Sequence, residues 1–404
     1  MKTNYISIEN LLNNSRKVDL RVSNLKGNKI LINGNVINNL GTAIKNPLYL
    51  NNGKIVEKDL FLRGISTFED VDIIDLKGNF LTPALIDQHV HGSFGVDFNG
   101  SEETDIRSLL RKMKEWGYSK ILATFVPDTI ERLNSQIKLL QNIMNRREAN
   151  ETEIVGINLE GPFFSKKRSG IHDPALLLKP TLENINKLDL DAVKLITIAP
   201  ENDANYETIK YLNDRNIITS AGHSDANAQQ VRDSGVKCIT HLFNAMRPFH
   251  HRIPTIVNEG LRNNDIYVEV NTALELIAPD TINLIQQVKP DDKIILISDA
   301  LRGLKDGETS FVLGTKEIFV DEKGIAKDDI GTLAGSLMLL GQVAKTIVDK
   351  TNITFEKFIK YTTLNPARLL GINDDLYIKE GQKPDMTIWD KSSLKPIKTF
   401  IKGE

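Results

Sequence analysis

The chain has 404 residues, of which 40% are hydrophobic and 26% are charged, so it can bury one large domain and a smaller one. Its formal net charge of −2 at pH 7 favours neither nucleic acid nor a membrane surface as a partner, and no apolar run is long enough to span a membrane. The single cysteine, Cys238, excludes an internal disulfide and is interpreted as a buried structural thiol; we expect a cytoplasmic protein.

The two ends of the chain share a β-like texture. Residues 29–83 contain short β-like segments with Asn-Gly turns, and residues 377–404 return to the same pattern. We therefore expect one small β-sandwich domain formed from both chain ends. Residues 1–28 are polar and rich in asparagine, and they carry no secretory signal, so we interpret them as an N-terminal extension or an edge element.

The middle of the chain, residues 84–376, alternates between strand-like and helix-like segments. Continuous apolar runs are typical of parallel strands that are buried on both faces. Eight such runs lie at residues 84–89, 120–126, 154–160, 193–198, 217–223, 237–242, 266–271 and 293–299. Helix-like stretches such as 106–116 and 130–144 separate them. This order predicts an α/β fold with a (β/α)8 TIM-like barrel, in which the active site lies at the C-terminal ends of the strands.

Histidine and acidic residues recur where these apolar runs end. The first run ends in His89 and His91, which strand alternation sends to the same side. The other positions are Glu160, His223, His241 and Asp299. Because an unpaired ionisable group is costly to bury, its repetition at five strand ends indicates a functional role. Imidazole and carboxylate groups bind divalent metals, so we interpret these six residues as metal ligands.

Longer motifs surround these positions. They are LTPALID at residues 81–87, NLEGPF at 158–163, SGIH at 169–172, AGHS at 221–224, HLFNAM at 241–246, SDA at 298–300, GTLAGS at 331–336 and NPA at 365–367. Over about residues 73–390 the chain resembles the amidohydrolases and, within them, the N-acetylglucosamine-6-phosphate deacetylases. The NLEGPF and HLFNAM segments are more specific to the deacetylases than the paired histidines, which amidohydrolases share.

The resemblance implies a hydrolase of linear amides with one or two divalent ions per subunit. Glu160, His223 and His241 would hold one ion, and His89 and His91 would hold a second, with Glu160 bridging and Asp299 nearby. Zinc fits such a ligand set, and iron, manganese and cobalt fit it as well. Asp299 is the candidate general acid and base, and its alternative role is metal ligation alone.

The same resemblance implies a set of substrate-binding residues and a homodimer. The set comprises Ile171, His172, Asn244, Ala245, Arg252, Leu333, Ala334 and Gly335. His172 would polarise the acetyl carbonyl, and Arg252 would bind the phosphate, which suits a guanidinium fork. Backbone groups of the Leu333 segment would approach the sugar.

One segment departs from the family pattern. Where the family has Asp-Gly-x-His, residues 271–275 read Asn-Thr-Ala-Leu-Glu, so Glu275 is expected at the position of a substrate-contacting histidine. A carboxylate there would repel phosphate unless a cation offsets it, and Arg302 is a candidate for that cation. The departure leaves the hydrolytic chemistry intact and makes the phosphate group of the substrate an open question.

Three functions fit the sequence. The first is hydrolysis of N-acetylglucosamine 6-phosphate to glucosamine 6-phosphate and acetate. The second is the same chemistry on another N-acyl amino sugar of different stereochemistry or phosphorylation. The third is a non-catalytic barrel that serves as a scaffold, against which the six predicted ligands argue.

Overall fold

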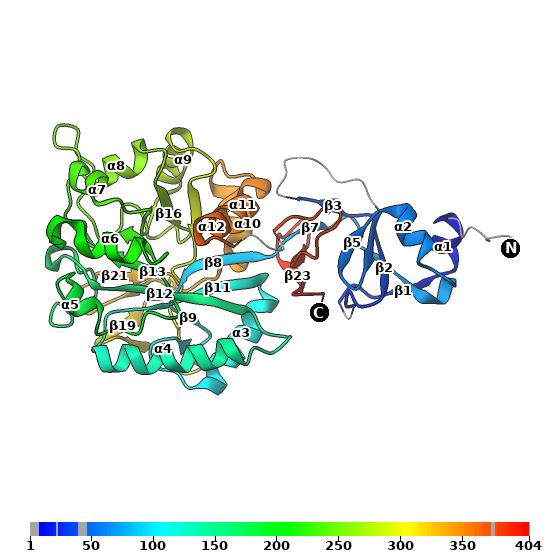
Figure 1. The fold of residues 1–404 in the computed structure, drawn as a ribbon, viewed down its shortest axis with the longest axis horizontal. Helices are drawn as coiled ribbons and strands as arrows, with labels where there is room; N and C mark the ends of the chain where they lie inside the picture. Colours follow the sequence, from blue (N-terminus) through cyan, green and yellow to red (C-terminus); the bar gives the residue numbers. More distant parts are fainter. Residues whose placement is uncertain (1–7, 22, 39–46, 373–375, 404) are drawn as a thin grey trace.

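The middle of the chain forms a barrel of parallel strands surrounded by helices (Figure 1). The computed structural model describes residues 8–21, 23–38, 47–372 and 376–403. In the order of the sheet, the eight strands are β17 (Ile294–Ile297), β16 (Tyr267–Asn271), β15 (Cys238–Ile239), β14 (Ile218–Ala221), β13 (Val193–Ile198), β12 (Glu153–Phe163), β11 (Tyr118–Phe125) and β8 (Leu85–Val90). Every predicted run therefore forms a strand, and the barrel prediction is confirmed.

The barrel closes between its first and last strands through main-chain contacts. The N–H of Asp299 donates to the carbonyl of His89 at 2.9 Å, and the N–H of His91 donates to the carbonyl of Ala300 at 2.8 Å. Strands such as β8, β11 and β17 are buried along their whole length. This burial on both faces explains why the runs are apolar without alternation.

Amphipathic helices cover the outside of the barrel. They are α3 (Glu103–Glu115), α4 (Ile130–Asn145), α5 (Leu182–Ile185), α6 (Glu207–Asn213), α7 (Ala228–Ser234), α8 (Ile256–Arg262), α9 (Pro279–Val288), α10 (Leu340–Lys350), α11 (Phe355–Thr362) and α12 (Leu364–Leu370). In α3 the buried residues are Ile106, Leu109, Leu110 and Met113, the spacing of one helical face. None of the helices in the described ranges combines the length and apolar character needed to cross a membrane.

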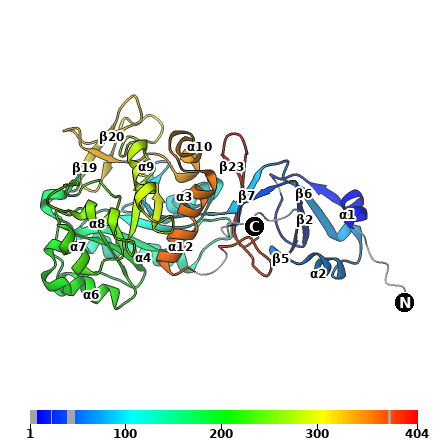
Figure 2. The same ribbon diagram turned by 90° about the horizontal axis from the view of Figure 1, so that it is seen from above.

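Beside the barrel lies a small domain of two sheets (Figures 1 and 2). One sheet has the order β1 (Arg16–Val18), β6 (Val71–Asp75), β2 (Asn28–Ile32), β4 (Leu48–Asn51) and β5 (Lys54–Val56), and helix α2 (Lys58–Arg63) follows β5. The other has the order β23 (Pro396–Phe400), β22 (Met386–Trp389), β7 (Phe80–Pro83) and β3 (Asn35–Val36). Leu31, Ile74, Met386 and Phe400 meet in one buried cluster, so both ends of the chain contribute to the same core, as predicted.

The described part of the N-terminal segment packs onto this domain. Helix α1 (Ile8–Asn14) buries Leu11 against Ile30 and Phe61, and β1 pairs in parallel with β6 at the edge of the five-stranded sheet. Within residues 1–28, β1 is thus an edge strand, and the assignment of this segment as an N-terminal extension stays a prediction. Residues 1–7 and 22 lie outside the described residues.

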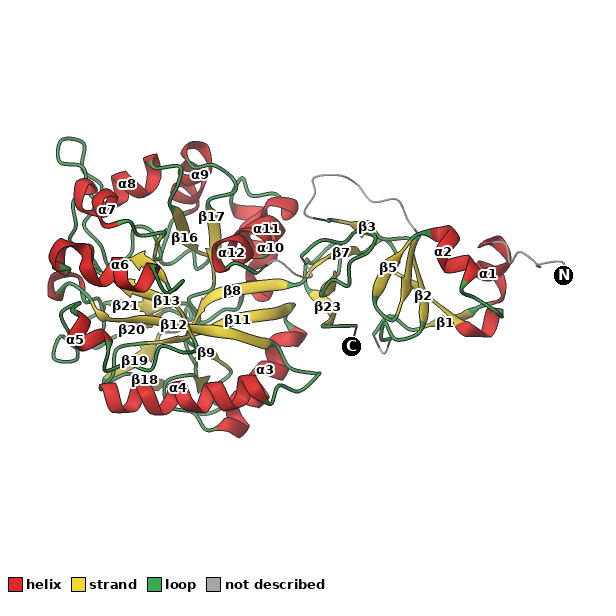
Figure 3. Ribbon diagram, in the orientation of Figure 1, coloured by secondary structure: helices red, strands yellow, loops and turns green. Residues whose placement is uncertain are grey.

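A four-stranded antiparallel sheet, inserted between β17 and α10, was not foreseen from the sequence. Its strands are β18 (Ser310–Leu313), β19 (Lys316–Val320), β20 (Ala326–Lys327) and β21 (Leu333–Gly335), and Figure 3 shows them grouped at one end of the barrel. Phe311 and Leu313 pack with Val126, Ile171 and Leu301 of the barrel loops in a separate apolar cluster. The insertion therefore forms an apolar wall over the loops at the mouth of the barrel. A shorter hairpin, β9 (Gly92–Ser93) and β10 (Val96–Asp97), follows β8.

Candidate metal centre

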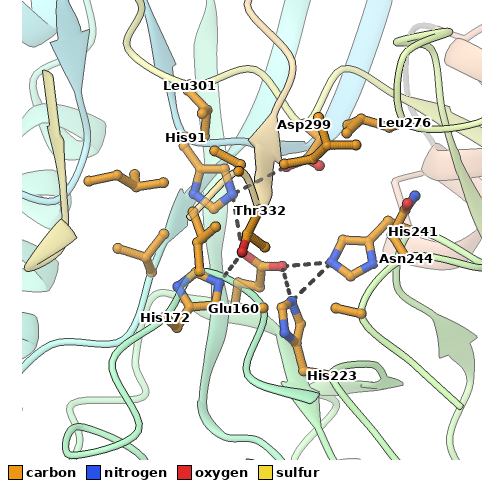
Figure 4. A pocket seen from close by; sticks show the side chains of 18 residues that line it. His91, Glu160, His172, His223, His241, Asn244, Leu276, Asp299, Leu301 and Thr332 are labelled. Atoms are coloured by element: carbon orange, nitrogen blue, oxygen red, sulfur yellow. Dashed lines mark hydrogen bonds and ion pairs between the residues drawn. The ribbon is translucent and has the colours of Figure 1, made fainter. Parts of the chain in front are cut away.

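The six predicted ligands converge at the C-terminal ends of the barrel strands, and Figure 4 shows His91, Glu160, His223, His241 and Asp299 among them. His89 lies in β8, and Glu160 lies in β12. His91 comes directly after β8, and the other three come two residues after a strand end: His223 after β14, His241 after β15 and Asp299 after β17. All six residues are at least 93% buried. Residues separated by up to 210 positions in the chain thus meet at one end of the barrel, as the fold predicts.

The backbone leaves the extended conformation at three of these ligands. The φ angles of His223, His241 and Asp299 are 46°, 29° and 49°, a region that non-glycine residues rarely adopt. Strands β14 and β15 end sooner than the apolar runs at 217–223 and 237–242 predict, because the chain turns at these residues. Such backbone strain concentrates at functional sites, where it directs side chains to a common point.

One group of donor atoms comes from Glu160, His223 and His241. Glu160 Oε1 lies 3.0 Å from His223 Nε2 and 2.8 Å from His241 Nε2, and the two nitrogens are 3.2 Å apart. The donor atoms of this group all lie within 4.8 Å of one another. Burial by itself would raise the pKa of Glu160, but the imidazoles of His89, His223 and His241 outweigh burial and hold this pKa well below its usual range.

The second group comprises His89, His91 and Asp299. The Nε2 atoms of the two histidines are 3.3 Å apart, and Asp299 Oδ1 lies 3.6 Å from His89 Nε2 and 3.4 Å from His91 Nε2. Glu160 Oε2 lies 3.2 Å from His91 Nε2, so the Glu160 carboxylate stands between the two groups.

The protonation pattern of the imidazoles tests whether these groups fit a cation. His223 Nδ1 donates to the carbonyl of Arg168 at 2.9 Å, and His89 Nδ1 donates to Glu269 Oε2 at 3.1 Å. In a neutral imidazole with a proton on Nδ1, Nε2 carries a lone pair. The lone pair of His223 Nε2 would face Glu160 Oε1 and that of His89 Nε2 would face Asp299 Oδ1, an arrangement that is repulsive unless a cation, either a proton or a metal ion, lies between them.

The nitrogen spacing also fits. Two imidazole nitrogens at the usual ~2.05 Å from one tetrahedral zinc ion are about 3.3 Å apart. The observed separations are 3.2 Å and 3.3 Å. Both groups therefore have the donor types and the spacing of a transition-metal site.

A cavity of about 430 Å³ opens above these ligands. Its size is that of a small-molecule site. The predicted substrate-binding residues that line it are Ile171, His172, Asn244, Ala245, Leu333 and Ala334. Burial lowers the pKa of His172 to about 3, so its imidazole is neutral. The side-chain nitrogen of Asn244 is buried without a hydrogen-bond partner and is available to a ligand.

Three predicted substrate contacts do not line this cavity. Arg252 is exposed, and its main-chain N–H donates to His250 Nδ1 at 3.1 Å in a loop outside the cavity. Gly335 lies behind Asp299, where an added Cβ would come within 3.1 Å of the Asp299 carbonyl oxygen. Glu275 is exposed to solvent, and Leu276 lines the cavity instead.

The outward orientation of Glu275 and the inward orientation of Leu276 have a physical cause. After β16 the chain makes a turn in which the N–H groups of Leu276 and Ile277 donate to the carbonyl of Ala273 at 3.0 and 3.3 Å. Leu274 and Ile277 pack into the barrel core, which anchors the turn on its inner side. Glu275 is thereby directed outward, and the cavity receives an apolar side chain.

Arg302 is likewise not available to offset a charge in the cavity. Its guanidinium donates to Glu308 Oε2 at 3.0 Å and to the carbonyl of Gly95 at 3.2 Å, and it lies over the ring of Phe311. The expectation that Arg302 balances Glu275 is therefore not met, because both side chains are oriented away from the cavity.

Two residues of β16 contact the ligands, and the sequence reasoning assigned neither a role. Glu269 contacts His89, and Asn271 Nδ2 donates to Asp299 Oδ2 at 2.8 Å. Because the two residues are separated by one position, both point into the barrel. The available signal was Glu269 itself, a carboxylate in the middle of an apolar run, where burial without partners is costly.

Comparison with known proteins places this site in a family. The model of the amidohydrolase family matches residues 80–404. The chain belongs to the amidohydrolase family. This amidohydrolase is 34% identical to N-acetylglucosamine-6-phosphate deacetylase of Bacillus subtilis (strain 168), over 80% of the chain and 83% of the relative. It is 27% identical to N-acetylgalactosamine-6-phosphate deacetylase of Escherichia coli O157:H7, over 83% and 89%.

Solved structures of amidohydrolases share the fold. The crystal structure of N-acetylglucosamine-6-phosphate deacetylase from Thermotoga maritima has a TM-score of 0.80 and 26% identity, with 93% of this chain and 98% of that chain covered. The similarity thus includes the small domain as well as the barrel.

Proposed function

We propose that the protein is a metal-dependent deacetylase that hydrolyses N-acetylglucosamine 6-phosphate to glucosamine 6-phosphate and acetate. The observation that carries this proposal is the convergence of six buried imidazole and carboxylate groups beneath a cavity of about 430 Å³. The relatives named for this activity span most of the chain. A scaffold without chemistry has no physical need to bury such a set of ionisable groups.

The metal ligands are proposed to be Glu160, His223 and His241 for one ion, and His89, His91 and Asp299 for a second, with Glu160 between them. A divalent ion bound there supplies an activated water and polarises the amide carbonyl. Zinc is our first choice, and iron, manganese or cobalt remain alternatives.

Asp299 is proposed as the general acid and base. Its carboxylate lines the cavity, and Asn271 holds Oδ2, which leaves Oδ1 turned toward the histidines. The carboxylate takes the proton of the attacking water as the new C–O bond forms, and it returns this proton to the amide nitrogen as the C–N bond breaks. Protonation makes the amine a competent leaving group, and the products are acetate and the free amino sugar.

His172 and Asn244 are proposed to orient the substrate. The neutral His172 imidazole can donate a hydrogen bond to the acetyl carbonyl oxygen, and the unpartnered Asn244 amide can donate to a sugar hydroxyl. Leu276, Leu301 and Leu313 form the apolar side of the cavity and exclude water from the reacting amide.

One observation favours a second candidate, a related N-acyl amino sugar. Among the described residues that line the cavity, none is lysine or arginine, the usual partners of a phosphate dianion. Arg252 is exposed outside this cavity. Unphosphorylated N-acetylglucosamine is therefore one substrate to compare, and N-acetylgalactosamine 6-phosphate, the substrate in the name of one relative, is another. A homodimeric assembly and a cytoplasmic location stay predictions.

The test is acetate release from these three substrates by the metal-reconstituted protein. We expect N-acetylglucosamine 6-phosphate to have the highest kcat/KM, and Asp299→Asn to lower its kcat by about 10²–10⁴-fold, the usual contribution of a general acid and base. Asp280→Asn, an exposed change at the start of α9, is the matched control and should leave kcat unchanged. Turnover of only another sugar would select the second candidate, and no turnover with metal bound would reject both.

A further inference from the structure

A buried glutamate lies directly behind the candidate metal centre. Glu269, in β16, is fully buried and does not line the cavity. Its Oε1 accepts a hydrogen bond from Gln88 Nε2 at 2.7 Å. Its Oε2 lies 3.1 Å from His89 Nδ1 and accepts from the main-chain N–H of His241 at 3.3 Å.

Two of the three partners of this carboxylate, the Gln88 amide and the His241 main-chain N–H, can only donate. An ionised carboxylate only accepts hydrogen bonds, so contact with Glu269 requires the proton of His89 to lie on Nδ1. His89 Nε2 then carries the lone pair, and this atom faces His91 Nε2, Glu160 and Asp299. The proton of one buried imidazole is thus placed by a residue 180 positions away in the chain.

Glu269 also joins the two ligand groups. It contacts the ring of His89, which is in the same ligand group as His91 and Asp299. It also contacts the main chain of His241, which is in the same ligand group as Glu160. The His241 main chain is in the left-handed region, with φ at 29°, so an acceptor for its N–H stabilises an otherwise strained turn.

We propose that Glu269 is a positioning residue that holds His89 in the tautomer able to bind a metal, and that it thereby sets the affinity of the His89, His91 and Asp299 group for its ion. The proposal rests on the metal centre of the proposed function. Residues that contact metal-binding histidines from behind fix the tautomer and ring orientation, and their loss typically weakens metal affinity 10–100-fold.

The discriminating variant is Glu269→Gln. The amide has one acceptor oxygen for three donors, so its NH2 group must face a donor or force His89 to move its proton to Nε2. A proton on Nε2 blocks that nitrogen as a ligand. Glu259→Gln is the matched control, because Glu259 is also a fully buried carboxylate, but it lies on α8 and pairs with Arg232 and Arg262.

Metal content and affinity are the readouts, measured by elemental analysis and by competition with a chelator after zinc reconstitution. We expect two ions in the wild type and in Glu259→Gln. In Glu269→Gln we expect the weaker-bound ion to be lost or its dissociation constant to rise about 10–100-fold. The dissociation constant of the other ion should change less than about threefold. Thermal unfolding of the metal-free proteins separates this effect from a general loss of stability, which both variants would share.

Two ions of wild-type affinity in Glu269→Gln would overturn the proposal. If that variant fails to fold, nitrogen-15 NMR of the zinc-loaded wild type decides instead. The His89 signal is assigned by its loss in His89→Asn. A proton on His89 Nδ1 supports the proposal, and a proton on His89 Nε2 rejects it. A wild type that deacetylates with one ion would reject the role of Glu269 and leave the proposed function standing. A wild type without bound metal and without activity would reject both.

Discussion

Glu275 and Leu276 are neighbours in the chain but face opposite environments. Glu275 is exposed, whereas Leu276 lines the cavity, because Leu274 and Ile277 anchor the turn in the barrel core. The residue types indicated that this segment differs from the family pattern, but they did not indicate which of its side chains faces the substrate. A turn of four residues has no periodicity from which orientation can be read.

This orientation leads to a prediction at the residue scale. Leu276→Glu places a carboxylate in the cavity and should raise KM for N-acetylglucosamine 6-phosphate at least about tenfold, because like charges repel across a poorly solvated site. Glu275→Gln should change kcat/KM less than about twofold, since this side chain points to solvent. Steady-state kinetics check both variants, with Leu276→Met as the control for bulk. Equal effects of the two charge changes would contradict the orientation.

At the scale of elements, local sequence signals correctly located most strands and helices. The eight apolar runs became β8 and β11 to β17, and residues 106–116 and 130–144 became α3 and α4. The insertion β18 to β21 was missed because its strands are only two to five residues long. Such short strands are defined by their pairing and by packing over the barrel mouth, which a local pattern does not reveal.

Helix α7 offers a prediction at this scale. Asn227 Oδ1 accepts from the N–H of Gln230, and Gln230 Oε1 accepts from the N–H of Asn227, each at 2.9 Å. Asn227→Ala removes the capping oxygen that accepts from the N–H of Gln230, while the main-chain N–H of residue 227 remains, and should lower the free energy of unfolding by about 1 kcal/mol. Asn227→Ser retains a capping oxygen and should recover most of that loss. Urea denaturation gives both values, and an Asn227→Ala variant as stable as the wild type would argue against the cap.

For the molecule as a whole, a buried ion pair joins the barrel to the small domain. Lys120 of β11 binds Asp385, the residue before β22, and their side chains are 9% and 2% exposed. Asp385 also accepts from the main-chain N–H of Lys402 at 2.7 Å. The pair therefore links the first half of the barrel to the C-terminal end of the chain.

Breaking this pair should destabilise the protein strongly. Lys120→Met leaves the Asp385 carboxylate buried without its cation and should lower the free energy of unfolding by about 3–5 kcal/mol. The double variant Lys120→Met/Asp385→Asn removes the orphaned charge while keeping an acceptor, so it should recover more than half of the loss. Urea denaturation of the metal-free proteins measures both. A double variant no more stable than Lys120→Met would show that the lost contact, and not the buried charge, causes the effect.

The sequence by itself determined the eight strands of the barrel, the β domain from both ends and the residue types of the candidate metal centre. These features are local: each strand has its own apolar run, and each candidate ligand lies at or just after the end of one. Only the tertiary structure decided that Leu276 and not Glu275 enters the cavity, that Arg302 pairs with Glu308, and that Glu269 meets His89. Side-chain direction and protonation depend on neighbours that are distant in the chain, and a pattern read along one segment contains no information about them.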